Sequence, residues 1–169
     1  MNTPKLIGLA SIFLAAGFII SSSPAQVQSQ ARSQSDCQNV SGHIFGQIIG
    51  PNALCGGALT EIGTFTDESG QTLGSFVACV IGLEQSGNGA QKLQLTHTFM
   101  LDEGSTLTTS DSVVLSPVNP PLFVVNNRAD ITGGTEDLQD AHGFLRTHGT
   151  ADLSTGVLTL RYHGRVCTP

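Results

Sequence analysis

Histidines and arginines alternate along the segment 143–166, near the C-terminal end of the chain. The run Asp152–Gly156 predicts a hairpin turn in which a glycine supplies positive φ. Pairing across this turn sets the following five side chains on one face, with His148 opposite Arg161 and Arg146 opposite His163: Arg146, His148, Arg161, His163 and Arg165. Guanidinium groups bind carboxylates or phosphates through forked hydrogen bonds, and a histidine transfers protons near neutral pH. Arg146 and His148 are therefore candidate catalytic residues, and Arg161 and His163 candidate ligand-binding residues.

The opposite face of the same hairpin is apolar and small. Its members are Leu145, Thr147, Gly149 and Ala151 on one side and Leu158, Leu160, Tyr162 and Gly164 on the other. Such a set suits the interior of a barrel, so we favour a charged face that meets solvent or another subunit. A ligand site on the charged face is the alternative. A register slip of one residue would exchange the two faces.

His97 presents the opposite pattern, because it shares an apolar strand face with Leu95 and Phe99. A hydrogen-bonded core histidine is the favoured interpretation. The alternative is a residue that binds or protonates a ligand in a pocket, with His97 catalytic and Phe99 in contact with the ligand. Asp111 lies in the middle of an expected strand among Thr and Ser, which is unusual, but the sequence assigns it no role.

The composition excludes several classes of function. The chain has 169 residues with 13 acidic against 7 basic side chains, a net charge of −6 and no run of Lys or Arg, so no footprint for nucleic acid is expected. GxSxG, HExxH and GxxxxGK[ST] motifs are absent. The cysteines form neither a CxxC motif nor a cluster with histidine, so we expect no metal site. Neither Gly133-Gly134 nor Gly87–Gly89 matches the dinucleotide-binding fingerprint, so no cofactor is expected either.

The N-terminal segment predicts export. Lys5 precedes an uncharged apolar run over Leu6–Ile20, and Ser23 and Ala25 supply small residues at a cleavage site, as in a secretory signal peptide of residues 1–25. An uncleaved anchor is the alternative, but the run is shorter than a bilayer requires. We expect a flexible leader at 26–36, a domain at 37–169, a secreted or periplasmic location and no stable membrane insertion after processing.

Export favours disulfides among the four cysteines, all of which lie in the predicted mature chain. A closed barrel sets its first and last strands side by side, which favours Cys37–Cys167 and leaves Cys55–Cys79. A buried free thiol is the alternative for Cys79, because it lies in an apolar stretch.

Short segments rich in Val, Ile, Leu, Thr and Phe, separated by turn residues, predict an all-β fold. A small closed antiparallel β-barrel of about eight strands suits this length, although periodicity alone does not separate it from a sandwich. The expected strands are His43–Ile49, Ala58–Thr66, Thr72–Glu84, Gln91–Leu101, Thr106–Leu115, Leu122–Ile131, Gly143–Ala151 and Val157–Val166.

The glycine-rich turns of the C-terminal third resemble those of the allene oxide cyclase/dirigent-like barrel superfamily, and in particular its exported bacterial members. The resemblance rests on the segments 130–135 (DITGGT), 141–143 (Ala-x-Gly) and 149–156 (GTADLSTG), with Asp102–Thr109 and Pro117–Pro121 before them. Glu136 stands where the family's turn has its last glycine, and Leu138 where an aromatic is usual. Since glutamate tolerates positive φ poorly, a remodelled or strained turn is expected there.

The resemblance implies an eight-stranded, commonly trimeric barrel whose apolar cavity guides or cyclises reactive hydrophobic intermediates without a cofactor. Because the sequence displays no evident set of acid and base, we favour a non-catalytic exported barrel that binds a small hydrophobic molecule or a protein partner. The alternative is a cofactor-independent cyclase or isomerase that confines its substrate.

Overall fold

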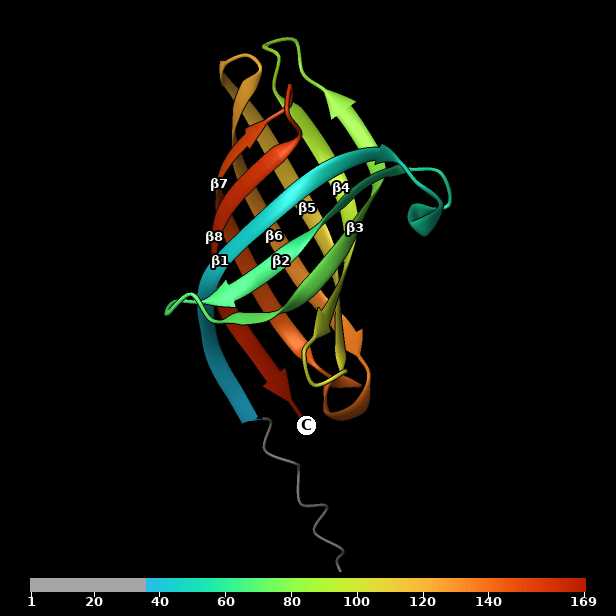
Figure 1. Ribbon diagram of the computed structural model, residues 1–169, viewed down its shortest axis with the longest axis vertical. Helices are drawn as coiled ribbons and strands as arrows, with labels where there is room; N and C mark the ends of the chain where they lie inside the picture. The colour runs from blue at the N-terminus through green and yellow to red at the C-terminus, as the bar shows by residue number, and fades with distance from the viewer. Residues whose placement is uncertain (1–35) are drawn as a thin grey trace, which may run out of the picture. The chain divides into compact units, whose positions relative to one another are not determined.

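The computed structural model describes residues 36–169, so the predicted signal peptide and all but the last residue of the predicted leader lie outside the described part. Eight antiparallel strands form a closed barrel in chain order, sealed by pairing of β8 with β1 (Figure 1). The strands are β1 (Asp36–Pro51), β2 (Leu59–Asp67), β3 (Thr72–Gln85), β4 (Gln91–Leu101), β5 (Thr106–Asn119), β6 (Leu122–Gly134), β7 (His142–Asp152) and β8 (Val157–Thr168). The predicted fold class is therefore confirmed, and every expected strand is present.

The described chain also contains two single-turn 3-10 helices, η1 (Ala53–Cys55) and η2 (Glu136–Leu138). Neither they nor any other helix within residues 36–169 could cross a membrane. The main difference from expectation is that β1 begins at Asp36 rather than at His43. Its first residues are mostly polar and do not alternate, and pairing with β8 defines them as a strand.

The barrel has two distinct ends (Figure 1). We call "upper end" the one formed by the β3–β4, β5–β6 and β7–β8 turns, and "lower end" the one that holds Asp36, Thr168 and the β4–β5 and β6–β7 loops. Successive side chains of each strand point alternately inward and outward, so apolar residues from all eight strands meet inside the barrel.

Phenylalanines from β2, β3 and β4 fill the middle of the barrel. Phe76 is 1% exposed, and a Cβ added at Gly63 would approach its ring to 2.7 Å. The Phe99 ring meets Phe65 edge-on at a centroid distance of 5.4 Å and lies 5.8 Å from Phe76. Glycine on β2 therefore makes room for an aromatic cluster inside the barrel.

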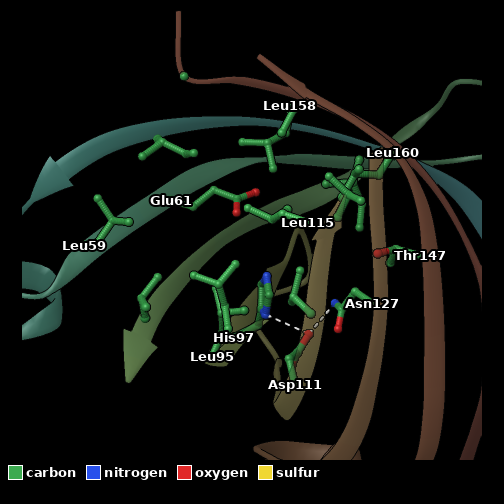
Figure 2. Close-up of a pocket in the computed structure, with 18 of the residues that line it drawn as sticks. Leu59, Glu61, Leu95, His97, Asp111, Leu115, Asn127, Thr147, Leu158 and Leu160 are labelled. Carbon is green, nitrogen blue, oxygen red and sulfur yellow. Dashed lines mark hydrogen bonds and ion pairs between the residues drawn. The ribbon is translucent and has the colours of Figure 1, made fainter. Parts of the chain in front are cut away.

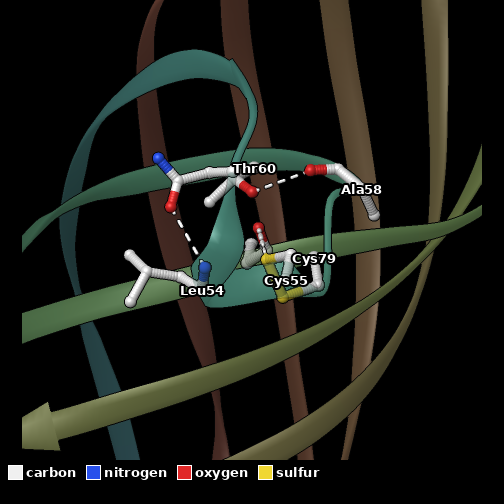
Figure 3. Close-up of a disulfide and its surroundings, with 7 residues drawn as sticks. Leu54, Cys55, Ala58, Thr60 and Cys79 are labelled. Carbon is white, nitrogen blue, oxygen red and sulfur yellow. Dashed lines mark hydrogen bonds between the residues drawn. A yellow bond between two sulfur atoms is a disulfide. The ribbon is translucent and has the colours of Figure 1, made fainter.

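Two disulfides tie the strands together, and both match the pairing favoured by the sequence. Cys37 and Cys167 are directly paired residues of β1 and β8 and close the barrel at its lower end. Cys55 joins Cys79, so η1 is fastened to β3 (Figure 3). The turn is shaped further by the Asn52 side chain, which accepts a hydrogen bond of 3.0 Å from the Leu54 amide. Disulfides of this kind are typical of extracellular or secreted proteins.

Glu136 is the only non-glycine residue of the described chain with positive φ, at 52°. The resemblance described above places a glycine at this position, and the glutamate adopts here a backbone conformation that its side chain does not favour. A residue other than glycine in this conformation costs about 1 kcal/mol or more.

Replacing Glu136 with glycine is therefore expected to stabilise the protein, raising Tm by about 3 °C for about 1 kcal/mol. Calorimetry of Glu136→Gly beside Asp137→Gly, a neighbour in the same turn without positive φ, tests this. If both variants lose stability, the glutamate is not strained.

Candidate functional site

A cavity of about 360 Å³ occupies the upper part of the barrel. Most of its wall is aliphatic, contributed by residues such as Leu93, Leu95, Val113, Leu115 and Leu160. The inward positions of β2, β4, β5, β6 and β7 also add polar side chains to that wall, among them Glu61, His97, Asp111, Asn127 and Thr147. Figure 2 shows these side chains converging on one space from different strands.

His97 lies at the floor of this cavity. Its Nδ1 is 3.1 Å from Asp111 Oδ2, an ion-pair distance, although the two groups are not aligned as a hydrogen bond. Its ring stacks on Phe99 at a centroid distance of 5.4 Å and an interplanar angle of 11°. Figure 2 shows the other ring nitrogen, Nε2, directed away from Asp111. The imidazole is thus held on one side by a carboxylate and presents Nε2 on the other.

Asp111 is 1% exposed and is held by two neighbouring side chains. Its Oδ1 accepts a hydrogen bond from Thr109 Oγ1, and its Oδ2 accepts one of 2.6 Å from Asn127 Nδ2. These bonds fix the carboxylate beneath His97 and compensate the cost of burying it.

Glu61 reaches the same cavity from β2, two strands away from His97 in the same row, because Glu61 and His97 both pair with Ala78 of β3. Burial in apolar surroundings raises the pKa of its carboxyl, the positive charge of His97 opposes that rise, and the negative charge of Asp111 adds to it. Burial alone would lower the pKa of His97. The contact with Asp111 and the charges of Asp111 and Glu61 outweigh it and raise the pKa of the imidazole above its ordinary value.

These shifts make the stability of the protein depend on pH. Glu61 binds its proton more tightly in the folded state than at its ordinary pKa of 4.5, so its contribution is fully present below about pH 4.5 and is lost as pH rises through the folded pKa. The pKa of His97 is also raised in the folded state, so its contribution to stability is likewise lost as pH rises above about 6.5, the ordinary pKa of histidine. We expect Tm to fall as pH rises above about 4.5, and to fall less steeply in Glu61→Gln.

Calorimetry across this pH range is the measurement, with Glu84→Gln, an exposed glutamate of β3, as the matched control. Equal slopes in the Glu61→Gln variant and the wild type would contradict the raised pKa.

Two further polar atoms at the cavity wall have no hydrogen-bond partner among the described residues, Asn127 Oδ1 and Thr147 Oγ1. Thr147 is 6% exposed. Buried polar atoms are normally paired, so these oxygens are suited to hydrogen-bond a polar group of a bound molecule.

The residues predicted from the C-terminal hairpin do not reach the cavity. The predicted register is confirmed, with His148 opposite Arg161 and Arg146 opposite His163, but all four side chains are exposed on the outer face. Of the three candidate catalytic residues, only His97 lines the cavity inside the barrel. Phe99 does line the cavity, as expected of a ligand contact.

The four arginines of the described chain share this outer face on β6, β7 and β8. Arg128 pairs with Asp130 at 2.8 Å and Arg161 with Glu68 at 3.3 Å, while the guanidinium groups of Arg128 and Arg146 both lie over the Phe144 ring. A subunit contact on this face stays a prediction.

Sequence reasoning missed Glu61, Asn127 and Thr147 as members of the site and left Asp111 without a role. A usable signal existed, because Glu61 alternates with Leu59, Gly63 and Phe65 on what proves to be the inner face of β2. A charged residue on a strand face otherwise made of apolar residues and glycine is a candidate for function.

A second cavity of about 730 Å³ lies at the lower end, beyond the phenylalanine cluster. Phe99, Ile44 and Leu145 line both cavities and form the wall between them. Tyr162 lines the lower cavity, where its hydroxyl donates a hydrogen bond of 3.0 Å to the Thr66 carbonyl. Within residues 36–169 no group of three or more His, Cys, Asp or Glu could hold a metal ion.

Comparison with known proteins supports the fold. No protein-family model and no curated protein matches the chain. Two solved structures of pterocarpan synthase dirigent proteins are similar. GePTS1 is 14% identical over 80% of this chain and 86% of its own, with a TM-score of 0.48, and PsPTS1 is 17% identical over 79% and 96%, with a TM-score of 0.50. At such identities the likeness concerns architecture alone, and the chain has a dirigent-like eight-stranded barrel fold.

Proposed function

We propose that the protein binds a small, largely apolar molecule in the upper cavity and catalyses its isomerisation or cyclisation by proton transfer. The observation that carries this proposal is the set of Glu61, His97 and Asp111, buried together in an apolar cavity. Perturbed titratable groups that gather in a cavity are typical of active sites. The absence of such a set was the reason to favour a non-catalytic barrel from the sequence.

His97 would be the group that exchanges a proton with the bound molecule, because Nε2 is the ring nitrogen not directed at Asp111. Asp111 would act through His97, by holding the ring and stabilising its protonated form. Glu61, kept protonated to a higher pH than an ordinary glutamate, would donate a proton to the same molecule from a position two strands away on the cavity wall. An acid and a base that contact different atoms of one molecule can move a double bond or open a strained ring.

The apolar wall would supply the remaining part of catalysis. A small cavity restricts a flexible molecule to few conformers, and confinement near the reactive geometry lowers the barrier. The similarity to dirigent barrels agrees with such a role, since the dirigent proteins compared above are pterocarpan synthases. Binding without catalysis is the second candidate, and the placement of Arg146 and His148 outside the cavity favours it.

Binding is tested with N-phenyl-1-naphthylamine, a neutral dye that fluoresces in apolar surroundings. Val113 lines the upper cavity, whereas Val124 is an outward position of β6, so Val113→Phe and Val124→Phe are matched variants. We expect Val113→Phe to weaken dye binding at least about tenfold, because the larger ring fills the space. Val124→Phe should bind like the wild type. Equal affinity in all three proteins would refute the upper cavity as the binding site.

A further inference from the structure

Exposed apolar side chains of the described chain gather at the upper end of the barrel. Four of them are more than 60% exposed, namely Leu54, Ile81, Leu83 and Val118. The complete set, which we call the apolar rim, is Ile49, Leu54, Leu59, Ile81, Leu83, Val118, Leu122, Leu153 and Val157. Single exposed apolar residues are ordinary, but a concentration of them marks an interaction surface.

The apolar rim continues into the upper cavity. Leu59 and Leu153 belong both to the rim and to the cavity wall. Leu83 pairs directly with Leu93, another wall residue, so its side chain extends the inner face of β3 beyond the mouth. An apolar molecule could therefore move from the rim into the cavity without crossing a charged surface.

Charge is distributed in the opposite way. Acidic residues gather around the lower end, in the turns and at the start of β1: Asp36, Asp67, Glu68, Asp102, Glu103, Glu136, Asp137 and Asp140. The strand ends and turns of the upper end carry only Glu84, Lys92 and Asp152, and the Asp152 carboxylate is occupied by hydrogen bonds from Ser154. The barrel is thus apolar at one end and acidic at the other.

We propose that the apolar rim docks on the surface of a lipid bilayer, with the acidic end directed away from it. This inference rests on the proposed function, because apolar molecules of the kind the cavity would take dissolve in membranes. A second copy or another protein seated on the rim would close the mouth of the cavity, whereas a bilayer would supply the ligand through it. Since the upper end carries only Lys92 as a cationic group, beside Glu84 and Asp152, it has no basic cluster to bind anionic headgroups, and a neutral bilayer surface is favoured.

The test is co-sedimentation of the protein with phosphatidylcholine vesicles. The double variant Ile81→Asp/Leu83→Asp sets two charges in the rim, and Met100→Asp sets one at an exposed apolar position on β4 toward the lower end. We expect the double variant to lower the vesicle partition coefficient at least about tenfold, because the variant no longer has two aliphatic side chains to bury in the bilayer. Met100→Asp should leave it unchanged, and phosphatidylserine in the vesicles should not strengthen binding of the wild type, because the rim has no basic cluster.

Several outcomes would overturn the proposal: a wild type that does not sediment, a double variant that sediments equally, or a wild-type oligomer in solution that the double variant dissociates. The last would identify the rim as an interface between copies. Val118→Asp, in the exposed β5–β6 hairpin, repeats the test if the double variant does not fold. Dye binding is measured in parallel, so a protein that binds dye but not vesicles contradicts this inference alone. A protein that binds vesicles but no dye contradicts the proposed function.

Discussion

Replacing His97 with glutamine is expected to slow proton abstraction inside the barrel at least about a hundredfold. The suitable probe is 5-nitrobenzisoxazole, a small apolar compound whose ring opens to a phenolate when a base removes its C–H proton. In the wild type the rate should rise with pH as the His97 imidazolium, whose pKa is raised, loses its proton. A positioned base contributes about 10²- to 10⁴-fold, so His97→Gln should lower kcat/KM by at least about a hundredfold.

The matched control is His148→Gln, the same substitution on the exposed outer face of β7. It should react like the wild type, and dye binding should persist in both variants. An unchanged rate in His97→Gln, together with loss of the reaction in Glu61→Gln, would move the role of base to Glu61.

Asp111 is a positioning residue in this scheme, so its substitution has a different signature. Asp111→Asn removes the charge that raises the pKa of His97, and the midpoint of the pH–rate profile should shift to lower pH. A merely structural role would lower the rate without moving that midpoint.

Removing the Cys37–Cys167 disulfide is expected to cause the largest loss of stability. The two cysteines are 130 residues apart, and the chain-entropy relation gives about 5 kcal/mol for a loop of that length. The Cys55–Cys79 bridge closes only 24 residues, for which the same relation gives about 3.4 kcal/mol. A loss of about 5 kcal/mol is a third or more of the stability of an ordinary domain.

Denaturant unfolding of Cys37→Ser/Cys167→Ser beside Cys55→Ser/Cys79→Ser measures both values. The second pair is the control for the loss of any bridge, because it fastens only η1 to β3 while the barrel stays closed (Figure 3). A larger effect from the second pair would mean that barrel closure adds little to stability.

The sequence by itself determined the strands of this protein and the pairing across the β7–β8 turn. Alternation of apolar and polar residues specified the strands, and the turn at Asp152–Gly156 specified the register of β7 and β8 residue by residue. Strand period and turn geometry are short-range properties, so neighbouring residues are enough to define them. Adjacent first and last strands follow from barrel closure, which is why the cysteine pairing could also be predicted.

Only the tertiary structure decided the composition of the site. Glu61, His97 and Asp111 come from β2, β4 and β5, and Asn127 and Thr147 from β6 and β7. Alternation predicts which face of a strand a residue occupies, but strand tilt and the bulges in β1–β2 and β3–β4 set which residues lie at the same height in the barrel. The raised pKa values of Glu61 and His97 have the same origin, because burial and charge depend on distances through space rather than along the chain.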